Sequence, residues 1–246
     1  MTTTVGVLNL VLGTVYTCYG FMTIVDLRRG WATRGPSHFG FAWLAMAFTC
    51  GPHHLDHAAH VLLTDRPGGG LDLLAVIVGI PAGVSWFLLR VEALFGGKGD
   101  RFIDGTPRWL MVAPVLGAVY TASLFAALGT ITRGGALEPA VLPNVALLVL
   151  YGAIAVVLTS TQLRNHQVTG GWSLSGVSLA GVMFTCGYMH TVHAAYAQSG
   201  RYDVDIHGFT IDTLAIPASI YFLWVVLALH RGALRDWNAT QVGAHA

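Results

Sequence analysis

Apolar residues dominate the chain in seven long runs, and short polar or Gly/Pro-rich stretches separate these runs. The runs cover about 5–27, 37–63, 71–95, 108–130, 141–163, 173–198 and 209–230. Each has the length of about twenty residues that an α-helix needs to cross the hydrocarbon core of a bilayer. Backbone polar groups in lipid must be paired within their own segment, which a helix achieves. The pattern therefore predicts an all-α integral membrane protein with seven transmembrane helices.

The connections between the runs are short. They are rich in glycine and proline, as in RPGGG (66–70) and FGGKGDRFIDGTPR (95–108). None is long enough to fold independently, so no soluble domain is expected. The N-terminal run has neither a basic start nor a cleavage pattern, and we interpret it as the first span. We predict a single heptahelical membrane domain over residues 1–246.

An internal repeat organises this domain. FTCGPHHLDHAAH (48–60) aligns without a gap with FTCGYMHTVHAAY (184–196) at an offset of 136 residues, and eight of thirteen positions are identical. At the same offset, Ile80-Pro81-Ala82 matches Ile216-Pro217-Ala218. We predict that spans 1–3 and 5–7 form a parallel internal repeat, with repeat one at about 5–95, a connector span at about 108–130 and repeat two at about 141–232. The pseudo-twofold axis of such a repeat runs along the membrane normal.

Composition and charge agree with a membrane protein and orient it. Hydrophobic residues make up 54% of the chain and charged residues only 10%, and the mean hydropathy is +0.62. Ten of the thirteen basic residues follow odd-numbered spans, whereas Arg66, Arg133 and Arg201 fall on the other side. The positive-inside rule then places the N-terminus outside and the C-terminus in the cytoplasm. We expect a bacterial plasma membrane protein.

The same composition narrows the partners and the class of function. A net charge of +1 with few basic residues gives no basis for nucleic-acid binding. The expected partners are the lipid bilayer and a metal donor or other membrane subunits. Seven spans with an external N-terminus also suggest a retinal protein, which needs a lysine in its last helix. The only lysine, Lys98, lies in a loop, and this excludes a retinal chromophore.

The duplicated segments carry the candidate chemistry. At about 100° per residue, Cys50, His54 and His57 share one helix face, and Cys186, His190 and His193 repeat this face on the sixth span. His53 and His60 extend the first face. Burying so many polar side chains in hydrocarbon without a partner is costly, which favours a metal site over a purely structural hydrogen-bonded network. The predicted metal ligands are Cys50, His53, His54, His57, His60, Cys186, His190 and His193.

The residue types narrow the choice of metal. Imidazole with available thiol and thioether groups, and with few carboxylates, favours copper over zinc or iron. Haem b is the alternative, because two histidines on facing helices can ligate its iron and Gly51 and Gly187 would let a porphyrin edge approach. One bis-histidine haem would leave the other duplicated histidines unexplained.

Three functions therefore stand open. The first is copper binding or handling at a site near the extracytoplasmic face. The second is a metal-dependent membrane oxidoreductase acting on a lipid-soluble substrate, for which the sequence indicates no catalytic residue. The third is electron transfer by a b-type haem.

Some polar and sulfur-containing residues are expected to lie outside this site. We expect the outer carboxylates to be solvated loop charges, except for Asp56, which is placed to orient an imidazole. These carboxylates are Asp72, Asp203, Asp205 and Asp212. Cys18 is expected to be a core residue of the first span, and three cysteines form no disulfide framework.

Overall fold

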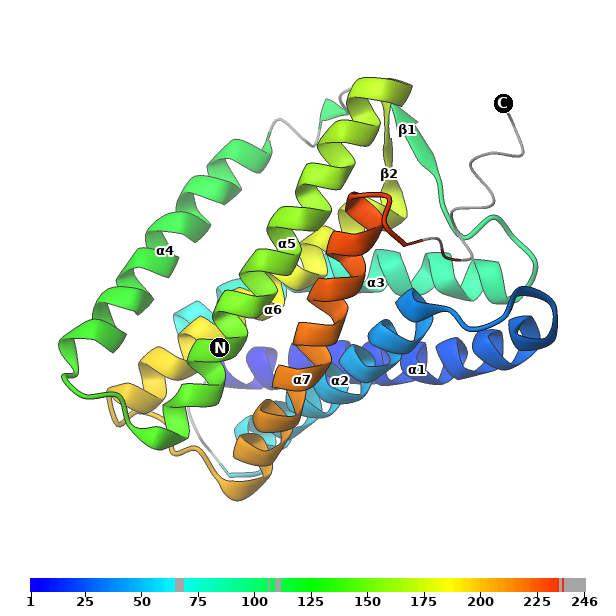
Figure 1. Cartoon of the computed structure of the whole chain (residues 1–246). Helices are drawn as coiled ribbons and strands as arrows, with labels where there is room; N and C mark the ends of the chain where they lie inside the picture. Colours follow the sequence, from blue (N-terminus) through cyan, green and yellow to red (C-terminus); the bar gives the residue numbers. More distant parts are fainter. Residues whose placement is uncertain (65–68, 106, 109–111, 235, 237–246) are drawn as a thin grey trace.

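The computed structural model describes residues 1–64, 69–105, 107–108, 112–234 and 236, so Arg66, Arg235 and the end of the predicted domain lie outside the described residues. Each of the seven apolar runs forms a helix (Figure 1), which confirms the prediction of an all-α fold with seven long helices. They are α1 (Thr2–Arg34), α2 (His38–Leu63), α3 (Gly70–Leu94), α4 (Ala113–Arg133), α5 (Leu142–Thr169), α6 (Leu174–Gln198) and α7 (Ile206–His230).

Five of these helices are long and apolar enough to cross a membrane, counted over the described part of the chain. The two helices outside this set are α2 and α6, whose mean hydropathy is lowered by the polar residues of the duplicated segments. These two helices also carry polar side chains that must be kept away from lipid. In α6, 17 of the 25 residues are buried.

Side-chain caps fix where α2, α6 and α7 begin. The hydroxyl of Ser37 accepts a hydrogen bond from the Gly40 amide, and the hydroxyl of Ser173 accepts one from the Gly176 amide. The Asp205 carboxylate caps α7 at the Gly208 amide in the same way. These bonds satisfy backbone donors that have no partner inside the helix.

Two short strands were not predicted. β1 (Phe102–Asp104) lies in the connection before α4, and β2 (Gly171–Ser173) lies between α5 and α6; the two pair antiparallel. Asp100 reinforces this pairing, because its carboxylate accepts hydrogen bonds from the Ser173 hydroxyl and the Ser175 amide. A 3-10 turn (Pro139–Val141) precedes α5.

Helix packing follows a paired pattern. α1 packs along α2 and α3, and α5 packs along α6 and α7. Contacts of α2 with α7 and of α3 with α6 then join the two halves. Exchanging α1 for α5, α2 for α6 and α3 for α7 leaves this pattern unchanged. α4 breaks it, since it packs mainly on α6 and stands at the side of the bundle (Figure 1).

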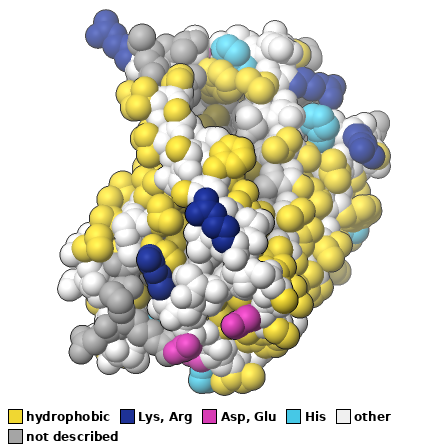
Figure 2. All heavy atoms as spheres, turned by 90° about the vertical axis from the view of Figure 1, so that its left-hand side faces the viewer, with side chains coloured by type: hydrophobic (Ala, Val, Ile, Leu, Met, Phe, Trp, Pro, Cys, Tyr) yellow, Lys and Arg dark blue, Asp and Glu magenta, His cyan; other side chains and the backbone are white. Residues whose placement is uncertain are grey.

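The surface is apolar and the interior holds many polar groups. Large hydrophobic side chains face outward on several helices, among them Phe21, Ile77, Leu88, Val115, Phe125, Val149, Val156, Leu214 and Ile220. Figure 2 shows such side chains over much of the face on the side of α4. Cys18 is also exposed, so the prediction that it lies in the core is wrong. An apolar surface of this extent matches a bilayer as the surrounding solvent.

Candidate metal centre

The duplicated histidines meet inside the bundle. The ring centroids of His53 and His190 are 4.7 Å apart, those of His53 and His193 are 5.1 Å apart, and those of His57 and His193 are 4.5 Å apart. All four rings are buried. Side chains from α2 and α6 thus form a row of imidazoles, within which three groups can be distinguished.

The deep group consists of His53, His54 and His190. The Asn9 side-chain oxygen lies 2.8 Å from His54 Nδ1, and the Asn144 side-chain oxygen lies 2.7 Å from His190 Nδ1. Both asparagine orientations are fixed, because the Asn9 amide donates to the Val5 carbonyl and the Asn144 amide donates to Asp212. Asparagine oxygens only accept, so Nδ1 of both rings carries the proton and Nε2 carries the lone pair.

The third ring of the deep group is held by a carboxylate. Asp212 accepts a hydrogen bond from His53 Nδ1 at 2.8 Å, and its other oxygen accepts from the Asn144 amide at 2.6 Å. His53 Nε2 is buried without a hydrogen-bond partner among the described residues. An amide or carboxylate on Nδ1 that leaves Nε2 available is the arrangement found around metal-binding histidines.

A small cavity of about 10 Å³ lies at this group, lined by Cys50, His53, His54, Cys186, Met189 and His190. This volume is close to that of one water-sized guest. The Cys50 thiol lies 2.7 Å from the Tyr151 hydroxyl, and Tyr151 packs on His190 as Tyr16 packs on His54, with ring centroids 5.3 and 5.4 Å apart. Cys50 and Cys186 are free thiols. The cavity therefore offers imidazole, thiol and thioether groups.

The middle group consists of His57, His193 and Asp72. Each offers a ligand atom within 4.8 Å of those of the others, and His193 Nε2 is 4.0 Å from Asp72 Oδ1. Both ring nitrogens of His57, Nε2 of His193 and Oδ1 of Asp72 are buried without a hydrogen-bond partner in the described part of the chain. Buried polar atoms are nearly always paired, and leaving them unpaired is costly. One such atom from each of the three side chains can therefore face the same point between them.

The outer group consists of Asp56, His60 and Asp205. His60 Nε2 lies 2.6 Å from an Asp205 oxygen, and its Nδ1 lies 3.4 Å from an Asp56 oxygen. These side chains are partly exposed, at 15% for His60, 19% for Asp56 and 28% for Asp205. The outer group lies where the C-terminal end of α2 meets the start of α7.

Two of the outer carboxylates are not solvated. Asp72 and Asp212 are 2% and 3% exposed, so the prediction of loop charges is wrong for both. Asp72 turns inward because one of its oxygens accepts the Gly69 amide at the start of α3, and Asp212 lies inside α7 on the face toward α2. Asp56 lies beside the His60 imidazole, but it makes no hydrogen bond to His60 Nδ1, so its orienting role stays a prediction.

The two asparagines were missed. Asn9 and Asn144 lie 135 residues apart, and Tyr16 and Tyr151 share this spacing, so an Asn-x6-Tyr pattern occurs in both α1 and α5. The offset differs by one from that of α2 and α6, because three residues connect α1 to α2 and four connect α5 to α6. Allowing one inserted residue in the alignment would have revealed the pattern.

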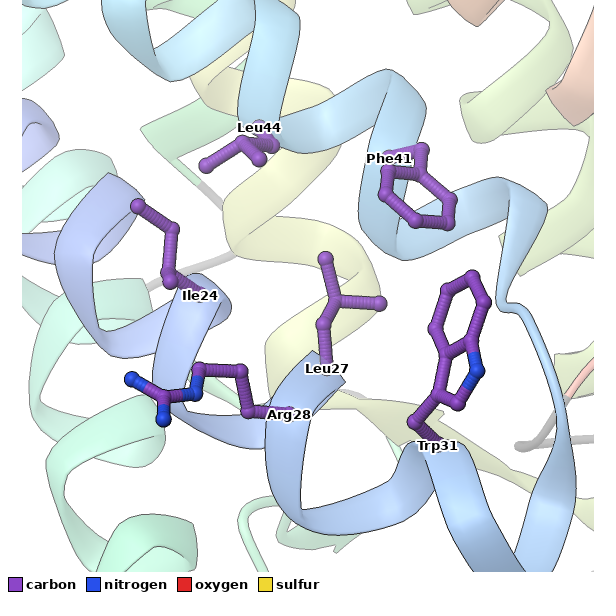
Figure 3. A pocket seen from close by; sticks show the side chains of 6 residues that line it. All are labelled: Ile24, Leu27, Arg28, Trp31, Phe41 and Leu44. Carbon is purple, nitrogen blue, oxygen red and sulfur yellow. The ribbon is translucent and has the colours of Figure 1, made fainter.

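A larger hollow lies elsewhere. A cavity of about 440 Å³ opens between α1 and the start of α2, lined by Ile24, Leu27, Arg28, Trp31, Phe41 and Leu44 (Figure 3). Its lining is mostly apolar and contains no metal-ligating side chain, so it has no part in the candidate centre.

Comparison of the chain with models of known families, with curated proteins and with solved structures returns no match. The chemistry of the chain is therefore argued from its own residues and their geometry.

Proposed function

We propose that the chain is a seven-span membrane protein that binds transition-metal ions between the two copies of a three-helix repeat. The exposed apolar faces support the spans, because they suit lipid, while the polar side chains of α2 and α6 are turned inward. The paired helix contacts and the matched Asn9–His54 and Asn144–His190 bonds support the repeat.

The unpaired atoms of the middle group carry this proposal. Two imidazoles and a carboxylate surround one space, and an ion at about 2 Å from each ligand atom would pair with all three side chains at once. His193 Nε2 and Asp72 Oδ1 are 4.0 Å apart. Side-chain movements on the order of 0.5–2 Å would bring both atoms to bonding distance from one ion.

A second ion is proposed beside the deep group, where His53, His190 and Asp212 offer ligand atoms within 4.8 Å of one another. Its three rings have Nδ1 engaged by Asn9, Asn144 and Asp212, which leaves three Nε2 atoms as donors. Histidines held in this way lose little orientational freedom when a metal binds, so the hydrogen bonds raise the affinity for the ion.

The ligand atoms favour a divalent ion. Copper was predicted on the premise that carboxylates are few, but each of the buried groups has a carboxylate beside its imidazoles, Asp72 or Asp212. Imidazole with carboxylate suits copper(II), zinc and iron(II), whereas copper(I) prefers sulfur. We propose a divalent ion from this set, with copper(II) first because it binds nitrogen and oxygen ligands more tightly than zinc or iron(II) does.

The size of the deep cavity separates the remaining alternatives. Pockets for organic ligands measure about 300 Å³ or more. The cavity of about 10 Å³ at the histidines is far smaller than this, and the closely packed Tyr16 and Tyr151 rings flank it. Binding or transfer of the ion itself therefore fits better than an oxidoreductase with an organic substrate, and better than a b-type haem.

Elemental analysis with an absorption spectrum tests the proposal. After incubation with Cu²⁺, Zn²⁺ or Fe²⁺ and gel filtration, we expect the purified protein to retain one or two equivalents of a divalent ion per chain. No Soret band is expected. Retention of none of the three ions would contradict the proposed function, and a Soret band in the protein as purified would show haem instead.

Orientation is part of the proposal and has its own test. We expect a cysteine introduced at Ser199, after α6, to react with a membrane-impermeant maleimide from outside intact cells, and one at Gln167, near the end of α5, to react only after lysis. Both positions are exposed. The background is Cys18→Ser, which removes the exposed native thiol. The opposite labelling would place the outer group on the cytoplasmic side.

A further inference from the structure

Three groups of ligands lie in series along α2. His53, His57 and His60 are spaced by four and three residues, so each follows the last by about one helical turn on the same side of the helix. Each meets a carboxylate from another helix or its cap: His53 meets Asp212, His57 lies by Asp72, and His60 meets Asp205. The same pair of ligand types is thus offered three times, at steps of about 5 Å.

The outer group is the most exposed of the three. His57, His193 and Asp72 of the middle group are at most 4% exposed, and His53, His54 and His190 of the deep group are at most 8% exposed. The outer group keeps 15–28% of each side chain exposed. Water therefore reaches the outer group more readily than the other two.

Helix caps position two of the carboxylates in the same manner. One oxygen of Asp72 accepts the Gly69 amide, and the other turns to the middle group; one oxygen of Asp205 accepts the Gly208 amide, and the other meets His60. Because each cap fixes one oxygen, the second is held in place as a ligand.

We propose that the outer group is the acceptor site at which a hydrated divalent cation first binds, and from which it passes to the middle group. This rests on the proposed function, since it assigns the route to the same buried sites. Two carboxylates and an imidazole match the charge of a divalent ion and can replace part of its water shell at the surface. The ion then moves by about one helical turn to His57, so that it gains a new ligand before it loses the last.

The contacts of His193 suit the passage of an ion between the middle and the deep group. The His193 ring is within 5.1 Å of His53 and 4.5 Å of His57, so it borders both buried groups. Tyr202, from the connection between α6 and α7, stacks on His193 with ring centroids 5.4 Å apart. The Tyr202 ring covers the middle group, so the exposed approach to this group is through His60 and the outer group.

Loading kinetics separate an acceptor site from a storage site. Purified protein in detergent is mixed with Cu²⁺ or Zn²⁺, and free ion is followed with a fluorescent chelator; ion retained after gel filtration gives the capacity. We expect His60→Ala and Asp56→Asn to slow loading by tenfold or more, with the retained equivalents unchanged. Asp205 is left intact because it also caps α7. Glu138→Gln, which removes an exposed acidic charge from the connection before α5 and belongs to none of the three groups, is the matched control.

The outcomes distinguish the two proposals. If the unaltered protein retains no ion, the proposed function fails. If it retains ion and the His60→Ala variant loads at the unaltered rate, the route through the outer group is wrong. A loss of retained ion in this variant without slower loading would also overturn the route, because it would make His60 a ligand of the final site.

Discussion

The double substitution His57→Ala/His193→Ala is expected to lower the affinity for the divalent ion by at least about 100-fold. Loss of a single orienting partner around a metal already costs about 10–100-fold, and this variant removes two of the three proposed ligands of the middle group. Asp72 alone would remain, as a lone carboxylate in a buried space. Competition titration of the purified variant against a chelator of known affinity measures the change.

Two other histidines provide the control. His38 pairs with the Tyr221 hydroxyl and His230 with the Thr161 hydroxyl, both apart from the three groups. The double variant His38→Ala/His230→Ala removes as many imidazoles, and we expect it to bind ion with unaltered affinity. Equal losses in both double variants would mean that the protein binds metal through scattered surface histidines, and the middle group would have no special role.

Periodicity and composition were sufficient to predict the helices. A run of about twenty apolar residues in lipid or in a buried core is expected to form a helix. The helical repeat then places Cys50, His54 and His57 on one face. The same reasoning found the equivalent face of α6. Convergence of these faces was predicted from the proposed duplication, because like helices in a pseudo-symmetric bundle would present like sides to the axis.

The carboxylates and amides of the centre could not be predicted in the same way. Asp72 and Asp212 occur near the starts of helices, where aspartate is usually solvated or caps the backbone. Their inward direction depends on how α3 and α7 are rotated against α6 and α2, and this is settled by packing across distant parts of the chain. The orientation of a helix about its axis is weakly encoded when its apolar residues surround it on all sides.

Stability should separate a binding site from a packing network. The double substitution His57→Leu/His193→Leu is expected to leave the metal-free protein as stable as the unaltered chain or more stable, because it removes buried nitrogens that have no partner among the described residues. An unpaired buried polar group costs about 1–3 kcal/mol. In the unaltered protein, ion at about 1,000 times its dissociation constant should add about 4 kcal/mol of stability, and the variant should lose this gain.

Thermal unfolding in detergent, with chelator and with excess ion, measures both effects. His54→Leu is the matched control, because it replaces an equally buried imidazole whose Nδ1 is hydrogen-bonded to Asn9. That change leaves the Asn9 oxygen unpaired, so we expect a lower melting temperature in chelator. If His57→Leu/His193→Leu also melts lower in chelator, by as much as the control, the imidazoles of the middle group stabilise the fold by packing. If this variant instead melts at a higher or equal temperature and does not respond to added ion, the opposite follows. The unaltered chain then keeps these nitrogens unpaired, at a cost in stability, because an ion binds there.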